Sequence, residues 1–246
     1  MYKKILLAGA VMAFAGVPVV LGAGAHWEYE GAEGPEHWGD LDAAYTACKV
    51  GKNQSPVDIS GGVDAELPPI TFNYVTRGDT VLNNGHTVQV NYLPGSSIEV
   101  NGHKYELKQF HFHAPSENTI NGESFPMEGH FVHADADGNL AVVGVMFREG
   151  EMNDTLQIAW DQLPMEASEP EALTGTLNAA RMLPDNRDYY QFSGSLTTPP
   201  CSEGVNWMVL KGVVTASPEQ LKQFTAAVHH ANNRPVQPLN ARVLIR

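Results

Sequence analysis

The feature that most constrains the fold is a series of short runs in which apolar and polar residues alternate, with turn residues between the runs. Alternation with a period of two places successive side chains on opposite faces of a β-strand. Asn-Gly pairs at 84–85 and 101–102, and the Asp- and Gly-containing segment 135–139, mark turns or bulges. The strands predicted in this way are 81–82, 87–92, 97–100, 103–112, 129–133, 140–147 and 207–210.

Helices are predicted at only two places. Ser217 and Gln220 form a capping box with Pro218 at the first helical position, and apolar residues follow on one face at 221, 224 and 228. Apolar residues at 156, 159, 160 and 163 have the spacing of a second short helix. The sequence therefore predicts a mostly β fold, with a large central twisted and mostly antiparallel sheet and a few short surface helices.

The first 25 of the 246 residues have the composition of a targeting segment. Lys3 and Lys4 give a basic start, residues 5–21 are uncharged and mostly apolar, and residues 23–25 (Ala-Gly-Ala) are a small-residue cleavage signal. The apolar stretch is nearly long enough for a retained membrane anchor, which is the alternative. We expect a cleaved signal peptide at 1–25, a single domain at 26–246 without a membrane span, and a periplasmic or secreted protein.

Charge and cysteine content narrow the classes of partner. The formal charge of −13 becomes −15 when Lys3 and Lys4 leave with the signal. A surface this acidic, without a basic patch, argues against nucleic acid and anionic lipid as partners. Outside the cytoplasm, the even count of two cysteines, Cys48 and Cys201, suggests one disulfide, with two buried free thiols as the alternative. The oligomeric state stays open, and a homodimer is compatible with the sequence.

Two histidines, His111 and His113, stand two positions apart at the end of a predicted strand. Side chains at this spacing share a strand face, so the two imidazoles converge. If the next predicted strand pairs with this one, His130 completes a set of three, because Glu128 then shares its face as an acidic partner. His133 would point to the opposite face. The H-x-H pair alone is a weak signal, and three histidines beside a glutamate are a stronger signal for a metal site.

Eight motifs occur in an order that resembles the α-class carbonic anhydrases of bacterial, secreted type. The resemblance extends from about His26 to the C-terminus. The motifs are Gly34-Pro-Glu-His-Trp38, Gln54-Ser-Pro-Val-Asp58, Leu82-Asn-Asn-Gly-His86, Gln109-Phe-His-Phe-His113, Pro115-Ser-Glu117, Glu128-x-His130-x-Val-His133, Ser195-Leu-Thr-Thr-Pro-Pro200 and Asn232-Asn-Arg-Pro235.

The resemblance implies a zinc lyase, carbonic anhydrase (carbonate dehydratase), whose small-molecule substrates are carbon dioxide and bicarbonate. The family's zinc ligands fall on His111, His113 and His130. Neutral imidazoles leave the full charge of Zn²⁺ available to polarise a fourth ligand, so that a zinc-bound hydroxide attacks carbon dioxide and a proton is released.

The resemblance also assigns the groups around the ligands. The side chains of Gln109 and Glu128 and the backbone carbonyl of Asn232 match the acceptors that hold the ligand imidazoles. Thr197 and Glu117 match the family's gate on the fourth position, in which the ionised carboxylate accepts the hydroxyl proton of the threonine. The family's substrate site falls on Thr197, Thr198 and the apolar residues Val132, Val142, Leu196 and Trp207.

His86 matches the family's proton shuttle, a catalytic role suited to a side chain whose unperturbed pKa is about 6.5. The family further implies cis peptide bonds before Pro56 and Pro200. Three positions depart from the family pattern: Asn118 replaces a common histidine, Gln89 replaces a common asparagine, and Asn233 replaces a frequent tryptophan. We expect Asn118 to loosen the network behind Glu117 and Gln89 to alter contacts with inhibitors and cavity water.

Two other functions compete with this assignment. A cupin-type metalloenzyme would use His111, His113, Glu117 and a later histidine as ligands, but Tyr105 stands where cupins have a glycine. A catalytically silent relative would serve as a binding or zinc-storage module. Such a relative is expected to lose a ligand or the gate, whereas this chain keeps both sets of residues.

Overall fold

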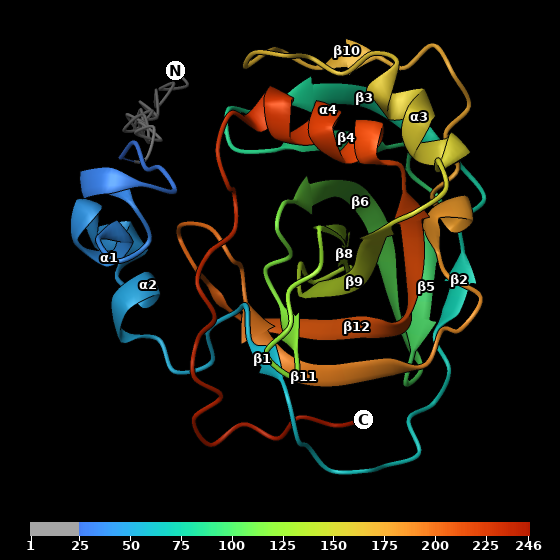
Figure 1. Ribbon diagram of the computed structural model, residues 1–246. Coiled ribbons are helices and arrows are strands. Elements are labelled where there is room, and N and C mark those ends of the chain that lie inside the picture. Colours follow the sequence, from blue (N-terminus) through green and yellow to red (C-terminus); the bar gives the residue numbers. More distant parts are fainter. Residues whose placement is uncertain (1–24) are drawn as a thin grey trace, which may run out of the picture.

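The computed structural model describes residues 25–246, and one large sheet carries most of their regular structure (Figure 1). The predicted targeting segment therefore lies outside the described residues, apart from Ala25. Among residues 25–246 we find no helix with the length and apolar character needed to cross a bilayer. The fold is mostly β, as the alternating runs predict.

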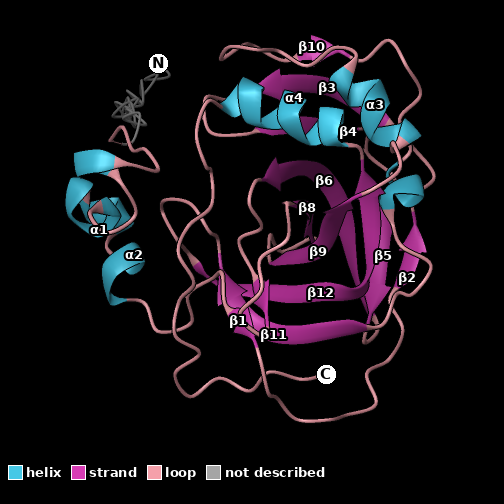
Figure 2. Ribbon diagram, viewed as in Figure 1, coloured by secondary structure: helices cyan, strands magenta, loops and turns pink. Residues whose placement is uncertain are grey.

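Ten strands form the main sheet, in the order β10-β3-β4-β6-β8-β9-β12-β11, with β5 beside β6 and β2 beside β5. Figure 2 shows the strands of this sheet in magenta. Most neighbours are antiparallel, but β9 and β12 run parallel, so the sheet is mixed. Strands β1 and β7 form a separate parallel pair. The strands are β1 Asp58–Ile59, β2 Thr71–Asn73, β3 Gly78–Asn83, β4 Val88–Tyr92, β5 Ser97–Val100, β6 His103–His113, β7 Thr119–Ile120, β8 Met127–Ala134, β9 Leu140–Glu149, β10 Glu171–Ala172, β11 Tyr189–Ser195 and β12 Glu203–Ala216.

Each predicted strand overlaps one strand of this sheet. The alternating runs did not reveal the short strands β1, β2, β7 and β10, they missed the longer β11, and they found only the centre of β12. In β11 the alternation of buried and exposed residues is broken, and a bulge shifts its register between Gly194 and Ser195. A bulge places two residues opposite one, so the period of two that identifies a strand is lost there.

Two of the helices pack on one another beside the sheet. Helix α4, Pro218–Val228, begins with the predicted capping box. Helix α3, Asp154–Trp160, is capped by the side chain of Asn153, which accepts from two backbone amides. The Trp160 and Phe224 rings stack with centroids 5.9 Å apart, which joins the helices. The remaining short helices are η1 Gly31–Glu33, α1 Trp38–Leu41, η2 Ala43–Tyr45, α2 Ala47–Val50 and η3 Ala179–Met182.

Strand β6 divides two environments. Phe110 and Phe112 enter the larger apolar core with Trp160, while the histidines that alternate with them face the other side. A smaller apolar cluster that includes Val142 and Trp207 lies on the histidine side. The phenylalanines therefore anchor the strand in the larger core, and this anchoring fixes the direction in which the histidines point.

The N-terminal region is tied to the end of the sheet by a disulfide between Cys48 and Cys201, with an S–S distance of 2.06 Å. The bridge is the one suggested by the even cysteine count. Cis peptide bonds precede Pro56 and Pro200, as predicted, and also Pro115.

Candidate metal centre

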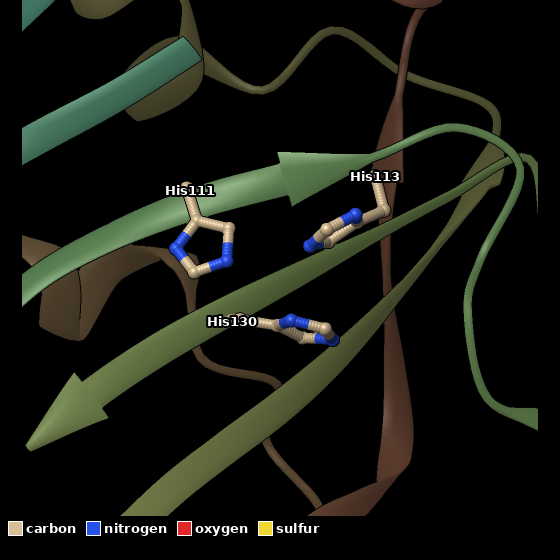
Figure 3. Close-up of side chains that lie close together, drawn as sticks. All are labelled: His111, His113 and His130. Carbon is tan, nitrogen blue, oxygen red and sulfur yellow. The ribbon is translucent and has the colours of Figure 1, made fainter. Parts of the chain in front are cut away.

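The pairing of β6 with β8 brings three histidines together. His111 and His113 share a face of β6, and His130 on β8 lies directly opposite His111 in the register. One nitrogen from each of the three rings lies within 4.8 Å of the other two (Figure 3). The structure thus selects His130, and not His133, as the third member of the set.

Each of the three rings has a different partner for its outer nitrogen. Nδ1 of His111 is 2.8 Å from Oε1 of Gln109, and Nδ1 of His113 is 2.7 Å from the backbone oxygen of Asn232. Nε2 of His130 lies 3.1 Å from Oε1 of Glu128. The nitrogens left facing the centre are therefore Nε2 of His111, Nε2 of His113 and Nδ1 of His130.

The three rings fit a divalent metal ion. Nε2 of His113 is buried without a hydrogen-bond partner among the described residues, which is costly unless a ligand satisfies it. Burial lowers the pKa of all three histidines, to about 4 for His113 and well below the usual value for His111 and His130. The rings are therefore neutral at pH 7, which is the form that binds metal. Three neutral nitrogens suit Zn²⁺ with an open fourth position.

A buried carboxylate, Glu117, faces the centre. Its Oε2 is 3.6 Å from Nε2 of His113 and 3.9 Å from Nδ1 of His130. Burial raises the pKa of Glu117 to about 8, while a hydrogen bond from the Thr197 side chain and one from the backbone N–H of Arg234 oppose the rise. A dication at the triad would favour the ionised form of such a neighbour.

The triad lines a cavity of about 170 Å³. Val132, Val142, Leu196 and Trp207 form its apolar wall, and Thr197 and Thr198 line it as well. All six residues that the resemblance assigned to the substrate site therefore lie around one cavity. Nε1 of Trp207 donates to the backbone oxygen of Ser195 at 2.9 Å, so the polar end of this wall residue is satisfied away from the cavity.

His86 lines the same cavity, on the turn between β3 and β4. Oδ1 of Asn84 accepts from the backbone amides of His86 and Thr87, each at 2.9 Å, and this holds the turn. Nδ1 of His86 has no partner among the described residues. Burial lowers the pKa of His86 from its usual value, Glu28 opposes the shift, and His26 and His230 reinforce it.

Three residues near the site were not identified from the sequence. Trp27 and Tyr29 line the cavity, and the Trp27 ring stacks on His86 with centroids 3.7 Å apart. The buried side chain of Arg234 donates to the backbone oxygens of Ser55 and Cys48. Arg234 belongs to the motif at 232–235, so the sequence could have drawn attention to it. The contact of Trp27 with His86 joins residues 59 positions apart, so no local pattern indicates it.

Among the departures from the family pattern, Asn118 is the one where the structure contradicts our expectation. Instead of loosening the network, Asn118 is fully buried, and its Nδ2 donates to Oε1 of Glu128 at 2.8 Å. The short amide reaches the carboxylate because its own backbone N–H binds the same group. Gln89 lines the cavity and donates to Oδ1 of Asn91 at 2.7 Å.

Comparison with known proteins agrees with this geometry. The sequence model of the eukaryotic-type carbonic anhydrases matches residues 33–246. A carbonic anhydrase of Pectobacterium carotovorum is 49% identical over 220 residues, which cover 89% of this chain and 90% of that protein. A carbonic anhydrase of Neisseria gonorrhoeae is 50% identical over 221 residues, which cover 89% of this chain and 87% of that protein.

Solved structures show the same relation. The α-carbonic anhydrase of Thermovibrio ammonificans, in complex with the inhibitor sulfanilamide, superimposes with a TM-score of 0.89 at 51% identity. The match covers 91% of this chain and 100% of that chain. With the family model covering most of the sequence and the fold shared at this level, the chain belongs to the eukaryotic-type, or α, carbonic anhydrase family.

Proposed function

We propose that the protein catalyses the reversible hydration of carbon dioxide to bicarbonate and a proton, with Zn²⁺ held by His111, His113 and His130. The observation that carries this proposal is the convergence of three neutral imidazoles, each with a polar partner beside its outer nitrogen. Gln109 and the backbone oxygen of Asn232 bond His111 and His113, and Oε1 of Glu128 lies 3.1 Å from Nε2 of His130. When bound, a zinc ion supplies a Lewis acid that lowers the pKa of a coordinated water to about 7, as in carbonic anhydrase itself.

The residues around the triad orient the reacting groups. Glu117, when ionised, only accepts hydrogen bonds, so it takes the hydroxyl proton of Thr197. Thr197 then offers a lone pair to whatever occupies the open position above the triad. It favours an oxygen that has a hydrogen to donate and disfavours an anion without one. The nucleophile's own lone pair is thereby turned away from Thr197 and toward the apolar wall.

Carbon dioxide is uncharged, and it is suited to the wall formed by Val132, Val142, Leu196 and Trp207. These side chains offer no hydrogen bond that would compete with the reaction, since the indole N–H of Trp207 is already engaged. Thr198 supplies a polar group beside this wall. Bicarbonate, which is charged, gains nothing from an apolar surface and is released.

The proton released in each cycle needs a carrier. Return of a proton to a base is limited by diffusion to about 10¹⁰ per molar per second, so an acid of pKa near 7 loses its proton unaided at about 10³ per second. Carbonic anhydrase turns over about 10⁶ times per second. His86 is suited to carry the proton, because its ring lines the cavity and its Nδ1 is free.

We further propose that residues 26–246 are the catalytic domain and that it works in the periplasm or after secretion. The disulfide between Cys48 and Cys201 supports an oxidising compartment. Hydrogen bonds around the disulfide also hold the loop that carries Thr197. Gln54 donates to the backbone oxygen of Cys201, and Arg234 donates to Gln54 and to the backbone oxygen of Cys48.

Stopped-flow carbon dioxide hydration by the mature protein, with zinc measured in the same sample, tests the proposal. We expect about one zinc per chain and hydration that is lost on chelation and regained with zinc. A silent zinc-storage module would contain zinc but leave the rate of hydration at the level of buffer. A cupin-type enzyme would contain iron or manganese, and its metal content would depend on Glu117.

A further inference from the structure

The carboxylate of Glu128 has a complete set of partners. Oε2 accepts from the backbone amides of Glu117 at 3.0 Å and Asn118 at 2.8 Å. Oε1 accepts from Nδ2 of Asn118 at 2.8 Å and lies 3.1 Å from Nε2 of His130. The side chain of Asn118 is thus the other group bonded to the oxygen that faces the ligand, and it determines where that oxygen sits.

Asn118 is itself held at both ends. Its Oδ1 accepts from the backbone N–H of Val57 at 3.0 Å, and its backbone oxygen accepts from Oγ of Ser116 at 2.8 Å. The partners decide the orientation of the amide, because a backbone N–H only donates and an ionised carboxylate only accepts. The amide therefore links the segment after Pro56 to the carboxylate behind the triad.

The space around Glu128 leaves little freedom. Gly144 on β9 lies opposite His130 in the register, and a Cβ at that position would be 2.9 Å from Oε1 of Glu128. Glu128 is fully buried. The carboxylate occupies a slot bounded by a glycine on one side and by the Asn118 amide on the other.

We propose that Asn118 is a positioning residue for the metal ligand His130, acting through Glu128, and that it slows the release of zinc from the site. The inference rests on the proposed function, since it requires that the triad binds zinc. Without the amide, Oε2 of Glu128 keeps its two backbone partners, but Oε1 keeps only the His130 contact and can swing about them. The His130 ring then loses the fixed acceptor that keeps its hydrogen on Nε2 and its Nδ1 directed at the metal.

The rate of zinc release measures this role directly. Zinc-loaded protein is mixed with an excess of a chromophoric chelator, and the rate of zinc transfer is compared among variants. Loss of a hydrogen-bond partner behind a ligand typically weakens metal binding 10- to 100-fold. We expect Asn118→Ala to release zinc at least about tenfold faster than wild type. Asn118→Asp should release it faster still, because a second carboxylate would face Oε1 of Glu128.

Ser116→Ala is the matched control. Ser116 is buried in the same loop and its Oγ bonds the backbones of Asn118 and Phe125, and it has no hydrogen bond to Glu128 within residues 25–246. Its loss should lower the unfolding midpoint of the metal-free protein without accelerating zinc release. Asn118→His should restore slow release, because a neutral imidazole has one donor for Glu128 and one acceptor for the Val57 amide.

A spectroscopic measurement separates positioning from general loosening. In zinc-loaded protein labelled at histidine nitrogen, the Nε2–H proton of His130 should give a strongly downfield resonance because of its bond to Glu128. We expect this resonance to shift upfield or broaden in Asn118→Ala and to stay unchanged in Ser116→Ala. If Asn118→Ala does not fold, Gly144→Ala displaces Oε1 of Glu128 from the other side and should also speed zinc release.

The inference is overturned if Asn118→Ala, or Gly144→Ala in its place, releases zinc at the wild-type rate. It is also overturned if Ser116→Ala releases zinc as fast as Asn118→Ala, because the effect would then reflect stability alone. Failure of the proposed function has a different signature: the wild-type protein itself would not retain stoichiometric zinc in the presence of the chelator.

Discussion

His130 and His133 lie three residues apart on strand β8, both fully buried, yet on opposite faces of the sheet. On one face, His130 keeps Nδ1 free toward two other imidazoles. On the other face, Nε2 of His133 is 2.7 Å from the hydroxyl of Tyr74 and Nδ1 is 3.3 Å from the backbone oxygen of Ala141. Both nitrogens of His133 therefore have hydrogen-bond partners within the protein, whereas Nε2 of His130 only lies 3.1 Å from the Glu128 carboxylate.

This difference shows which property marks the candidate metal site. Burial does not distinguish the two residues, and neither does the pKa, because burial lowers it for both. What distinguishes them is an inner nitrogen left free beside two others of the same kind. A neutral imidazole whose two nitrogens both have hydrogen-bond partners has no lone pair left for a metal ion. Three neighbouring imidazoles that each keep an acceptor nitrogen free can together bind one.

The most direct test of this comparison removes the imidazole of His130 in one variant and that of His133 in another. His130→Ala should lose tightly held zinc and lower hydration by at least about a thousandfold, because the metal-dependent nucleophile is lost. His133→Gln should keep about one zinc per chain and most of the activity. Metal analysis and stopped-flow hydration on both variants decide the matter, and full zinc occupancy in His130→Ala would refute the assignment.

The second test concerns the dependence of stability on pH. The pKa of His133 is lowered to about 3, whereas in the unfolded chain it is about 6.5. Between these values the unfolded chain binds one more proton at this residue, so the stability contributed above pH 6.5 is lost as the pH falls. From pH 6.5 to 5 the loss should be about 2 kcal/mol.

Urea unfolding of the metal-free proteins at pH 7 and pH 5 measures that loss. His133→Gln cannot take up a proton at position 133, so its stability should fall by about 2 kcal/mol less than that of wild type over the same interval. Equal losses in the two proteins would show that His133 does not titrate on unfolding in the expected way.

His86 is a third type of histidine: it is half-buried, its Nδ1 has no hydrogen-bond partner, and it belongs to no metal-ligand group found among residues 25–246. His86→Ala should lower kcat at least about tenfold in weak buffer and leave kcat/KM for carbon dioxide nearly unchanged, because proton export follows the chemical step. Added imidazole should restore kcat. Parallel losses in kcat and kcat/KM without rescue would mean that His86 supports the site structurally.

The smallest expected effect concerns the ring that covers His86. Trp27 buries one face of the imidazole, and burial is the main cause of its lowered pKa. Trp27→Ala should therefore raise the pKa of His86 toward its usual value, because the ring regains contact with water. Titration of the His86 ring resonance by NMR measures the shift, and Tyr45→Phe, outside the cavity, serves as the control. An unchanged pKa would mean that Trp27 does not control the solvation of His86.

Much of the site follows from local sequence. The spacing of His111 and His113 was enough to place both on one face, and the choice of His130 over His133 followed from the position of Glu128. The roles given to His86 and Thr197 depended on the family resemblance, because a single histidine in a turn and a threonine in a loop have no periodic signal of their own. We expected Asn118 to loosen the network behind Glu117, because the sequence does not show which groups its side-chain amide contacts.

The sequence by itself determined the strand faces, the helix starts and the set of candidate ligands, because these depend on residues within a few positions of one another. Only the tertiary structure decided the rest. The β6–β8 register set His130 opposite His111, the loop at Asn232 brought its carbonyl to His113, and the N-terminal segment placed Trp27 on His86. Such contacts join distant segments, and packing of the whole sheet, not local preference, selects among the pairings that the strands allow.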